Sequence, residues 1–163
     1  MAEKKIPDID LVSVLTPTMP SRARYWPSLV DSLYWQTYRE RPIEWLVYCD
    51  NASDSDAAFW EAAGKRLMEK CIILKFRSCE PMDIGAKRNA MMDAAEGEII
   101  IWQDDDDVML PKRVAVQTRG ILQEKAEAHS FQRVLVYNET TDEWGLVWDP
   151  GTHADLARAL HRT

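Results

Sequence analysis

Four consecutive carboxylates follow directly after an apolar run in this sequence. Residues 99–102 (IIIW) lead through Gln103 into the four aspartates of residues 104–107. Crowded carboxylates repel one another unless water, a proton or a hard divalent cation lies between them. Mg²⁺ or Mn²⁺ is commonly held by one or two carboxylates together with substrate phosphates. The run therefore predicts a metal site, with a solvated acidic loop as the alternative.

The elements that must position these acids form a regular alternation. Apolar runs at 11–15, 44–49, 71–76, 99–102 and 134–137 read as strands, and helical spacing of apolar residues separates them. This alternation predicts an α/β fold, a three-layer sandwich of about five to seven strands with a mostly parallel central sheet. Residues 142–148 could form a strand or hairpin arm, and residues 154–161 a short final helix.

Three more polar segments are expected to meet the acids at one sheet edge, because ligands of parallel sheets bind beyond the carboxyl ends of the strands. These segments are 16–21, 50–54 and 77–88. Asp50 could accept hydrogen bonds from a base or ribose, or it could only cap the next helix. Lys87 and Arg88, in the first turn of a helix, suit a phosphate, with plain surface charges as the alternative.

Length and composition limit the class of protein. The 163 residues predict a single domain, 1–163, with a polar tail at 1–9. The net charge of −7 argues against a broad nucleic-acid-binding face, and no apolar run reaches the ~20 residues of a membrane span. The three cysteines form no CxxC pair and are expected to be reduced. Because residues 1–5 lead into no apolar segment, we expect a cytoplasmic protein.

An ordered series of motifs resembles the family-2 glycosyltransferases, which have the GT-A (Rossmann-like) fold. The series runs from about Leu11 to Val116 and is more specific than any of its parts. Its members are VSVLTPT at 12–18, LYWQTY at 33–38, CDNAS at 49–53, GAKRN at 85–89, Gly97-Glu98, the acids at 104–107 and Pro111.

The resemblance implies a nucleotide-sugar site with assigned residues. Pro17 and Thr18 would border the nucleotide, Asp50 would contact its base, and Arg88 would lie near the diphosphate or shape the pocket. Residues 104–106 would supply the DxD motif.

Within that motif, Asp104 and Asp106 match the two acids. Asp106 would ligate Mn²⁺ or Mg²⁺, with Asp104 as a further candidate ligand, and Asp104 or Asp105 would contact the ribose or a metal-bound water. The ion would bridge the phosphates and stabilise the departing nucleoside diphosphate.

The sequence departs from the family pattern after these acids, since only 56 residues follow Asp107. The acceptor-binding half is therefore expected to be short or missing. Asp149 is the candidate general base, with a turn-forming Asp before Pro150 as the alternative. His153 could be a late metal ligand or a surface residue.

The resemblance implies an enzyme: a metal-dependent, inverting glycosyltransferase that uses a UDP-type sugar donor. The acceptor could be a glycan, a lipid-linked sugar, a small molecule or a modified base. One alternative is a nucleotide-sugar-binding domain without efficient transfer. Another is a haloacid-dehalogenase-like phosphatase, because Asp104-x-Asp106 follows a strand. That mechanism needs a downstream Lys and further metal-binding acids, whereas the sequence offers Lys112 and Lys125 within one expected helix and no later Asp pair.

Overall fold

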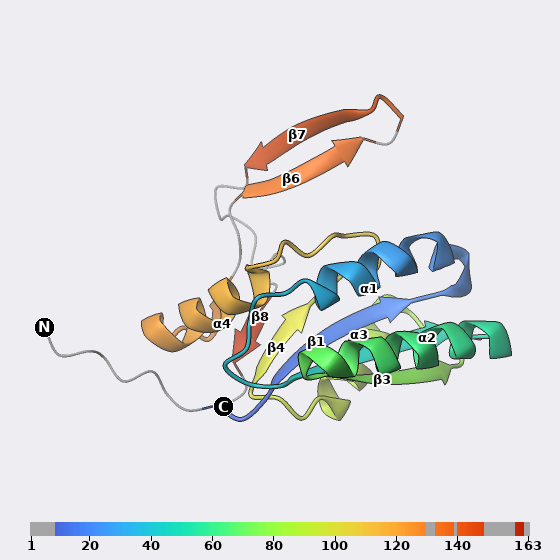
Figure 1. Cartoon of the computed structure of the whole chain (residues 1–163), viewed down its shortest axis with the longest axis horizontal. Coiled ribbons are helices and arrows are strands. Elements are labelled where there is room, and N and C mark those ends of the chain that lie inside the picture. The colour runs from blue at the N-terminus through green and yellow to red at the C-terminus, as the bar shows by residue number, and fades with distance from the viewer. Residues whose placement is uncertain (1–8, 130–132, 139, 149–158, 162–163) are drawn as a thin grey trace, which may run out of the picture.

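The computed structural model describes residues 9–129, 133–138, 140–148 and 159–161. Its main elements alternate along the chain (Figure 1). They are β1 (Val12–Thr18), a 3-10 turn η1 (Pro20–Tyr25), α1 (Trp26–Tyr34), β2 (Ile43–Asp50), α2 (Asp54–Leu67), a 3-10 turn η2 (Met68–Lys70), β3 (Ile72–Cys79), α3 (Ile84–Ala94), β4 (Ile99–Trp102), α4 (Arg113–Glu124), β5 (Ala128–His129), β6 (Arg133–Asn138), β7 (Glu143–Trp148) and β8 (Ala159–His161).

The central sheet has the strand order β3-β2-β1-β4-β8-β5. β1 lies between β2 and β4 and is parallel to both, and β3 is parallel to β2. Every residue of β1 is buried, as expected for an interior parallel strand covered on both faces. The predicted mostly parallel α/β sheet is therefore confirmed.

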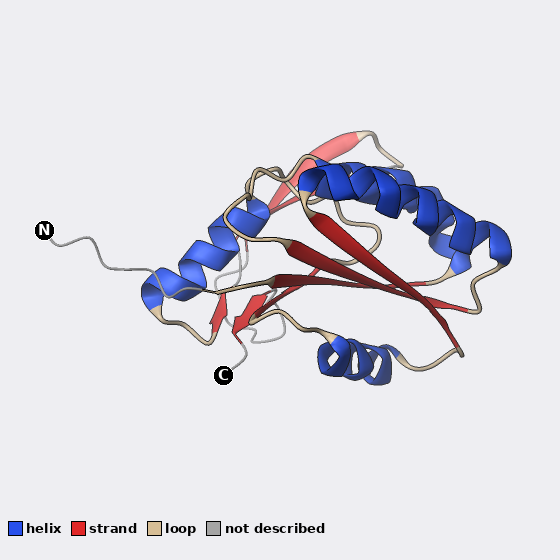
Figure 2. Ribbon diagram, turned by 60° about the horizontal axis from the view of Figure 1, so that its bottom comes forward, coloured by secondary structure: helices blue, strands red, loops and turns tan. Residues whose placement is uncertain are grey.

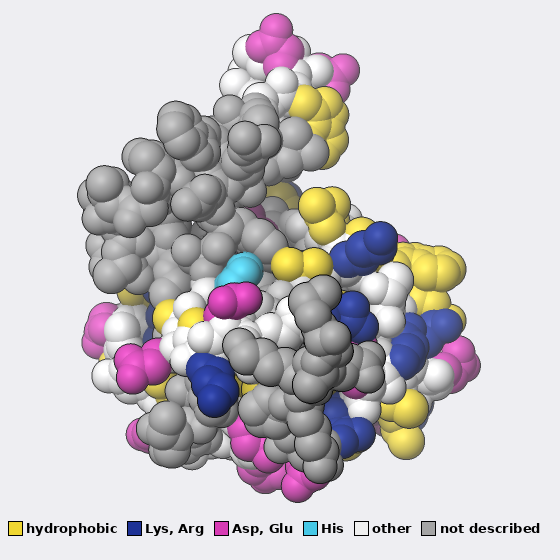
Figure 3. All heavy atoms as spheres, turned by 90° about the vertical axis from the view of Figure 1, so that its left-hand side faces the viewer, with side chains coloured by type: hydrophobic (Ala, Val, Ile, Leu, Met, Phe, Trp, Pro, Cys, Tyr) yellow, Lys and Arg dark blue, Asp and Glu magenta, His cyan; other side chains and the backbone are white. Residues whose placement is uncertain are grey.

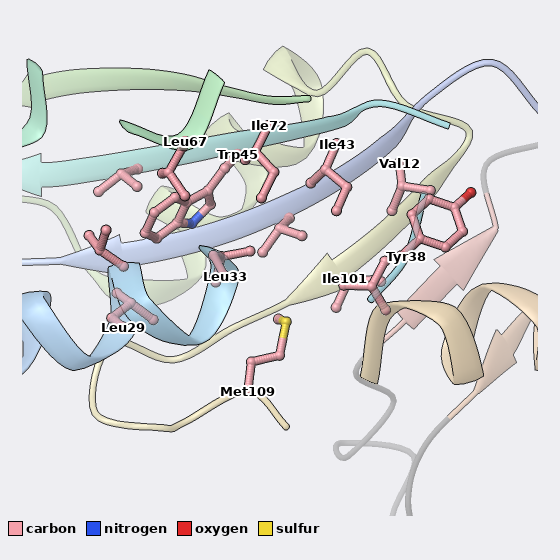
Figure 4. Close-up of a cluster of buried hydrophobic side chains, with 14 of the residues drawn as sticks. Val12, Leu29, Leu33, Tyr38, Ile43, Trp45, Leu67, Ile72, Ile101 and Met109 are labelled. Carbon is pink, nitrogen blue, oxygen red and sulfur yellow. The ribbon is translucent and has the colours of Figure 1, made fainter. Parts of the chain in front are cut away.

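Helices cover both faces of this sheet (Figure 2). The larger core packs α1, α2 and α4 against one face, and the smaller core packs α3 against the other. Figure 4 shows the larger core, where Leu29 and Leu33 from α1 and Leu67 from α2 surround the fully buried Trp45 of β2. Alternate residues of β1, β2 and β4 enter the two cores. Because β1 is parallel to β2 and β4, the carboxyl ends of these strands lie at the same edge of the sheet.

Two predictions for the C-terminal part are wrong. The predicted fifth strand exists as β6, but it pairs with β7 in a separate two-stranded antiparallel sheet. The chain reverses after Asn138, whose side-chain oxygen accepts hydrogen bonds from the amides of Thr140 and Thr141. This turn confirms the hairpin arm at 142–148. The predicted final helix is also wrong over residues 159–161, which form β8 and pair antiparallel with β4.

The surface carries charges of both signs. In the view of Figure 3, most basic side chains of the described residues lie on the right, whereas most acidic ones lie at the top, left and bottom. Within the described residues, no helix combines the length and apolar character that a membrane span needs.

The Gly97-Glu98 motif has a structural role in this fold. A Cβ on Gly97 would lie 2.6 Å from both the backbone nitrogen and the hydroxyl of Ser13, so only glycine fits against β1. The Glu98 carboxylate accepts hydrogen bonds from the amides of Asp10 and Leu11. These contacts join the start of β4 to the start of β1, far from the carboxyl ends of the strands.

Glu44 is a buried carboxylate at the same end of the sheet. It accepts hydrogen bonds from the Ser13 hydroxyl at 2.6 Å and from the amide of Glu96 at 2.9 Å, and the Lys75 ammonium lies 2.5 Å from its other oxygen. Burial alone would raise the pKa of Glu44, but its interactions with Lys75, Ser13 and Glu96 outweigh burial and lower that pKa. Glu44 is therefore held in its charged form.

The pH dependence of folding should report this network. A carboxylate whose folded pKa is depressed stabilises the fold above its unfolded pKa of about 4.3 and loses that contribution as the pH falls. We expect Glu44→Gln to lower the free energy of unfolding by about 1–3 kcal/mol at pH 7 and by less at pH 3, measured by urea denaturation. Glu61→Gln, which breaks an exposed pair with Lys65, is the control and should leave the midpoint unchanged. If Glu44→Gln lowers the free energy of unfolding by the same amount at pH 7 and at pH 3, this role of Glu44 is contradicted.

Candidate functional site

A cavity of about 570 Å³ opens at the carboxyl ends of the parallel strands. It is lined by residues from the end of β1, from η1, from the start of α3 and from the loop after β4. These residues are Pro17, Thr18, Met19, Ser21, Arg22, Ile84, Lys87, Asp104, Asp105 and Asp106. The predicted meeting of segments 16–21, 77–88 and 104–107 at one sheet edge is therefore confirmed, and Asp50 of the fourth segment contacts them through its ion pair with Lys87.

Asp105 is the anchored member of the acidic loop. Its carboxylate is buried and accepts a hydrogen bond of 2.6 Å from the Thr18 hydroxyl, which in turn accepts one from the Trp26 indole. The guanidinium of Arg22 donates to its other oxygen at 3.1 Å. Asp105 thus fixes the acidic loop to the end of β1.

Asp106 is the accessible member of the loop. Its side chain is 41% exposed and pairs with the same Arg22 guanidinium at 2.8 Å. Burial would lower the pKa of Arg22, but the charges and hydrogen bonds of Asp105 and Asp106 raise it. Arg22 therefore stays cationic between two neighbouring carboxylates.

Arg88 and Lys87 occupy different environments although they are adjacent in α3. Arg88 is half-exposed, pairs with Asp104 at 3.2 Å and lies over the Trp102 ring. Lys87 is only 3% exposed, and its ammonium lies 2.6 Å from a carboxylate oxygen of Asp50. The surface-charge alternative for Lys87 is therefore wrong.

Lys87 joins two strand ends. Its ammonium also donates to the backbone carbonyl of Thr18 at 3.2 Å, so it connects the end of β1 to the end of β2. The N-cap of α2 is Ser53, which forms a capping box with Asp56. The alternative in which Asp50 caps this helix is thus wrong, and Asp50 faces Lys87 instead.

Two buried glutamines set the path of the acidic loop. Gln103 donates to the carbonyls of Asp104 and Asp107 at 2.9 and 2.7 Å. Gln36, just after the end of α1, donates to the carbonyls of Met109 and Leu110 and accepts from the amide of Val114. Because each amide side chain bonds backbone groups of the loop, these glutamines hold the carboxylates in position. From the sequence, Gln36 was noted only as part of the motif at 33–38, and this role was not predicted.

Arg113 completes the support of this loop. It donates to the side chain of Gln103 at 2.5 Å and to the carbonyl of Trp102 at 2.7 Å. Neither Arg22 nor Arg113 was predicted from the sequence as part of the site. Arg22 contacts Asp105, about 80 positions away, and Arg113 contacts Gln103, 10 positions away, and no local pattern indicates either contact.

The donor set suits a divalent ion that is shared with a phosphate ligand. Within the described residues, no group of three or more His, Cys, Asp or Glu side chains is placed to hold a metal alone. Mg²⁺ and Mn²⁺ fit such a site when one or two carboxylates combine with phosphate oxygens and water. Asp106 and Asp104 line the cavity and supply such oxygens. Asp149 and His153 lie outside the described residues.

Comparisons with solved structures show the same fold. The S. aureus TarS structure is 21% identical, with 76% of this chain and 21% of that chain covered, and a TM-score of 0.63. S. aureus TarS 1–349 in complex with UDP-GlcNAc is 23% identical over 72% of this chain and 32% of that chain, with a TM-score of 0.61. The mannosyltransferase PcManGT from Pyrobaculum calidifontis, in complex with GDP-Man and Mn²⁺, is 19% identical over 72% of this chain and 33% of that chain, with a TM-score of 0.57.

The chain spans about a fifth to a third of the length of these proteins. No curated protein matched it. The similarity to these glycosyltransferases confirms the predicted GT-A type of α/β fold. The model of the family described as glycosyl transferase family 2 matches residues 13–161, nearly the whole chain. The chain is therefore a member of glycosyltransferase family 2.

Proposed function

We propose that the cavity at the strand ends binds a UDP-type sugar donor through Mn²⁺ or Mg²⁺, and that the protein transfers the sugar with inversion. The balance of charge in the site is the observation that carries this proposal. Arg22, Lys87 and Arg88 face the four carboxylates of Asp50 and residues 104–106. An anionic diphosphate enters such a site more readily together with a divalent cation.

The nucleoside end of the donor is assigned to the ends of β1 and β2. Pro17 and Thr18 line the cavity. Asp50 forms an ion pair with Lys87, which also lines the cavity. Lys87 and the Cys79 thiol contact Oδ1 of Asp50, and no described contact uses its Oδ2. That oxygen can accept a hydrogen bond from a uracil N–H or a ribose hydroxyl.

The diphosphate end is assigned to α3 and the acidic loop. Arg88 can donate to phosphate oxygens from the first turns of α3, where the helix N-terminus adds positive potential. Asp106, with Asp104, would hold the divalent ion, which neutralises the charge that develops on the departing diphosphate. Asp105 holds the acidic loop in place, so that Asp104 and Asp106 stay in position for the ion.

Deprotonation of the acceptor requires a base outside this cluster. Asp149 remains the predicted base, His153 a predicted late ligand, and the acceptor class and the cytoplasmic location remain predictions. A donor-binding unit without efficient transfer is the second candidate function. It is favoured by the cavity lining, in which the described carboxylates all belong to the acidic loop.

Calorimetry with UDP tests donor binding. We expect UDP to bind in the presence of Mn²⁺ and to lose at least about tenfold in affinity after EDTA treatment, because the ion offsets carboxylate repulsion. Equal affinity in both conditions would contradict the proposed role of the metal. Hydrolysis of UDP-sugars by the same preparation separates the two candidate functions, since a binding unit would retain UDP affinity without turnover.

A further inference from the structure

Arg22 already places a cation between two carboxylates of the acidic loop. Its Nε lies 3.1 Å from Oδ1 of Asp105, and its Nη2 lies 2.8 Å from Oδ2 of Asp106. The planar guanidinium has donors spaced to contact two acceptors at once, which an ammonium group cannot do in the same way. Arg22 therefore occupies an oxygen of the same carboxylate that is proposed to ligate the divalent ion.

The two contacts of Arg22 differ in their surroundings. The Asp105 side chain is 7% exposed and is also held by the Thr18 hydroxyl. The Asp106 contact lies between side chains that are 39% and 41% exposed. Exposed ion pairs contribute little to stability, so Asp106 can be released at small cost while the Asp105 contact persists.

We propose that Arg22 is a positioning residue that acts through Asp106 and makes metal binding depend on the nucleoside diphosphate. The proposal rests on the proposed function. A divalent ion that arrives alone must compete with Arg22 for the Asp106 carboxylate and lie near the charges of Arg22, Lys87 and Arg88. A diphosphate removes both obstacles, because its oxygens ligate the ion and offer the guanidinium another anionic partner.

The consequence is a coupling between the two ligands. Mn²⁺ binds weakly to the protein alone and more tightly with UDP, and by linkage UDP gains affinity from Mn²⁺ by the same factor. Removal of Arg22 should strengthen the binding of Mn²⁺ alone and reduce this coupling. A residue with a merely structural role would not move the coupling in this direction.

The test compares Mn²⁺ dissociation constants with and without saturating UDP, measured from the electron paramagnetic resonance signal of free Mn²⁺. We expect Arg22→Gln to bind Mn²⁺ alone about tenfold more tightly than the wild type, since a positive charge next to the ligand is gone. The enhancement by UDP should fall by a similar factor. Arg24→Gln removes the same charge from the same 3-10 turn, where Arg24 contacts the Tyr25 ring, and should leave both values unchanged.

Two further variants test whether the gain in Mn²⁺ affinity depends on Asp106 and on the guanidinium group of Arg22. Adding Asp106→Asn to Arg22→Gln should abolish the gain in Mn²⁺ affinity. Arg22→Lys keeps the charge but cannot bridge both carboxylates. It should therefore change the affinity for Mn²⁺ alone and the enhancement by UDP in the same directions as Arg22→Gln, but by less. If thermal denaturation shows that Arg22→Gln is unfolded, Arg22→Lys takes its place in the test. Unchanged or weaker binding of Mn²⁺ alone in the folded variant, while wild type binds Mn²⁺ with UDP, would overturn the role of Arg22 only. A wild type that binds no Mn²⁺ even with UDP would overturn the proposed function and this inference with it.

Discussion

Replacing Asp106 with Asn is expected to weaken Mn²⁺-dependent UDP binding by at least about 100-fold, because it removes the accessible carboxylate of the cavity while keeping its shape. The fold should survive, since Asp106 is exposed and its one described side-chain partner is Arg22. Titration calorimetry at fixed Mn²⁺ measures the change. UDP binding in EDTA should be no weaker in the variant than in the wild type.

The neighbouring aspartate supplies the matched control. Asp107→Asn removes the same charge one position along the loop, but Asp107 does not line the cavity. We expect this control to change the affinity for UDP by less than about threefold, since a carboxylate outside the cavity lining cannot ligate the ion there and acts on it only through its charge. Equal losses in the two variants would show that the total charge of the loop, rather than ligation by Asp106, supports binding.

Lys87→Met should cause the largest loss of stability among the site variants. The substitution leaves the Asp50 carboxylate, which is only 14% exposed, without its cationic partner and also removes the hydrogen bond to Thr18. Breaking a buried ion pair from one side costs about 3–5 kcal/mol, and the partial exposure of Asp50 reduces our expectation to about 2–3 kcal/mol. Urea denaturation measures this free energy of unfolding, and UDP affinity should fall as well.

A second substitution separates charge from packing in this prediction. Asp50→Asn in the Lys87→Met background should recover part of the lost stability, because it removes the unpaired charge. It should not recover UDP affinity, since the carboxylate proposed to contact the nucleoside is gone. Lys65→Met, which breaks an exposed pair with Glu61, should leave the unfolding midpoint unchanged. Full stability in Lys87→Met would contradict the assignment of Lys87 as a buried connector of β1 and β2.

The parallel part of the fold could be predicted from the sequence because its signals are local. Strands buried on both faces, such as 99–102, read as unbroken apolar runs, and the helices between them show regular spacing. The placement of β6 could not be predicted in this way. The same apolar run suits a parallel strand or a hairpin arm, and the turn after it, where the Asn138 side chain accepts hydrogen bonds from the amides of Thr140 and Thr141, favours the hairpin.

The acidic residues of the site were predictable and their partners were not. A carboxylate run after a strand is visible in the sequence, whereas the contact of Arg22 with it joins residues more than 80 positions apart. Lys87 was ambiguous for a related reason. Charge at the start of a helix usually faces solvent, and only the packing of α3 against the sheet places this ammonium beside Asp50.

The family motifs divide into two roles in this structure. Thr18, Asp50 and Asp106 belong to the cavity or its contacts. Gln36 and Gly97 instead shape the backbone that carries them, through hydrogen bonds to the loop after β4 and through close contact with β1. The resemblance could identify these positions, but the structure separates the residues that position the loop from those available to a ligand.

A crystal structure of the chain with UDP and Mn²⁺ tests the central claim most directly. The anomalous signal of manganese should place one ion within about 2.3 Å of an Asp106 oxygen and of diphosphate oxygens. The base should lie beside Asp50, the phosphates should face Arg88, and the Arg22 guanidinium should have left Asp106 while keeping Asp105. UDP bound away from the cavity, or bound in it with no ion on the acidic loop, would contradict the account.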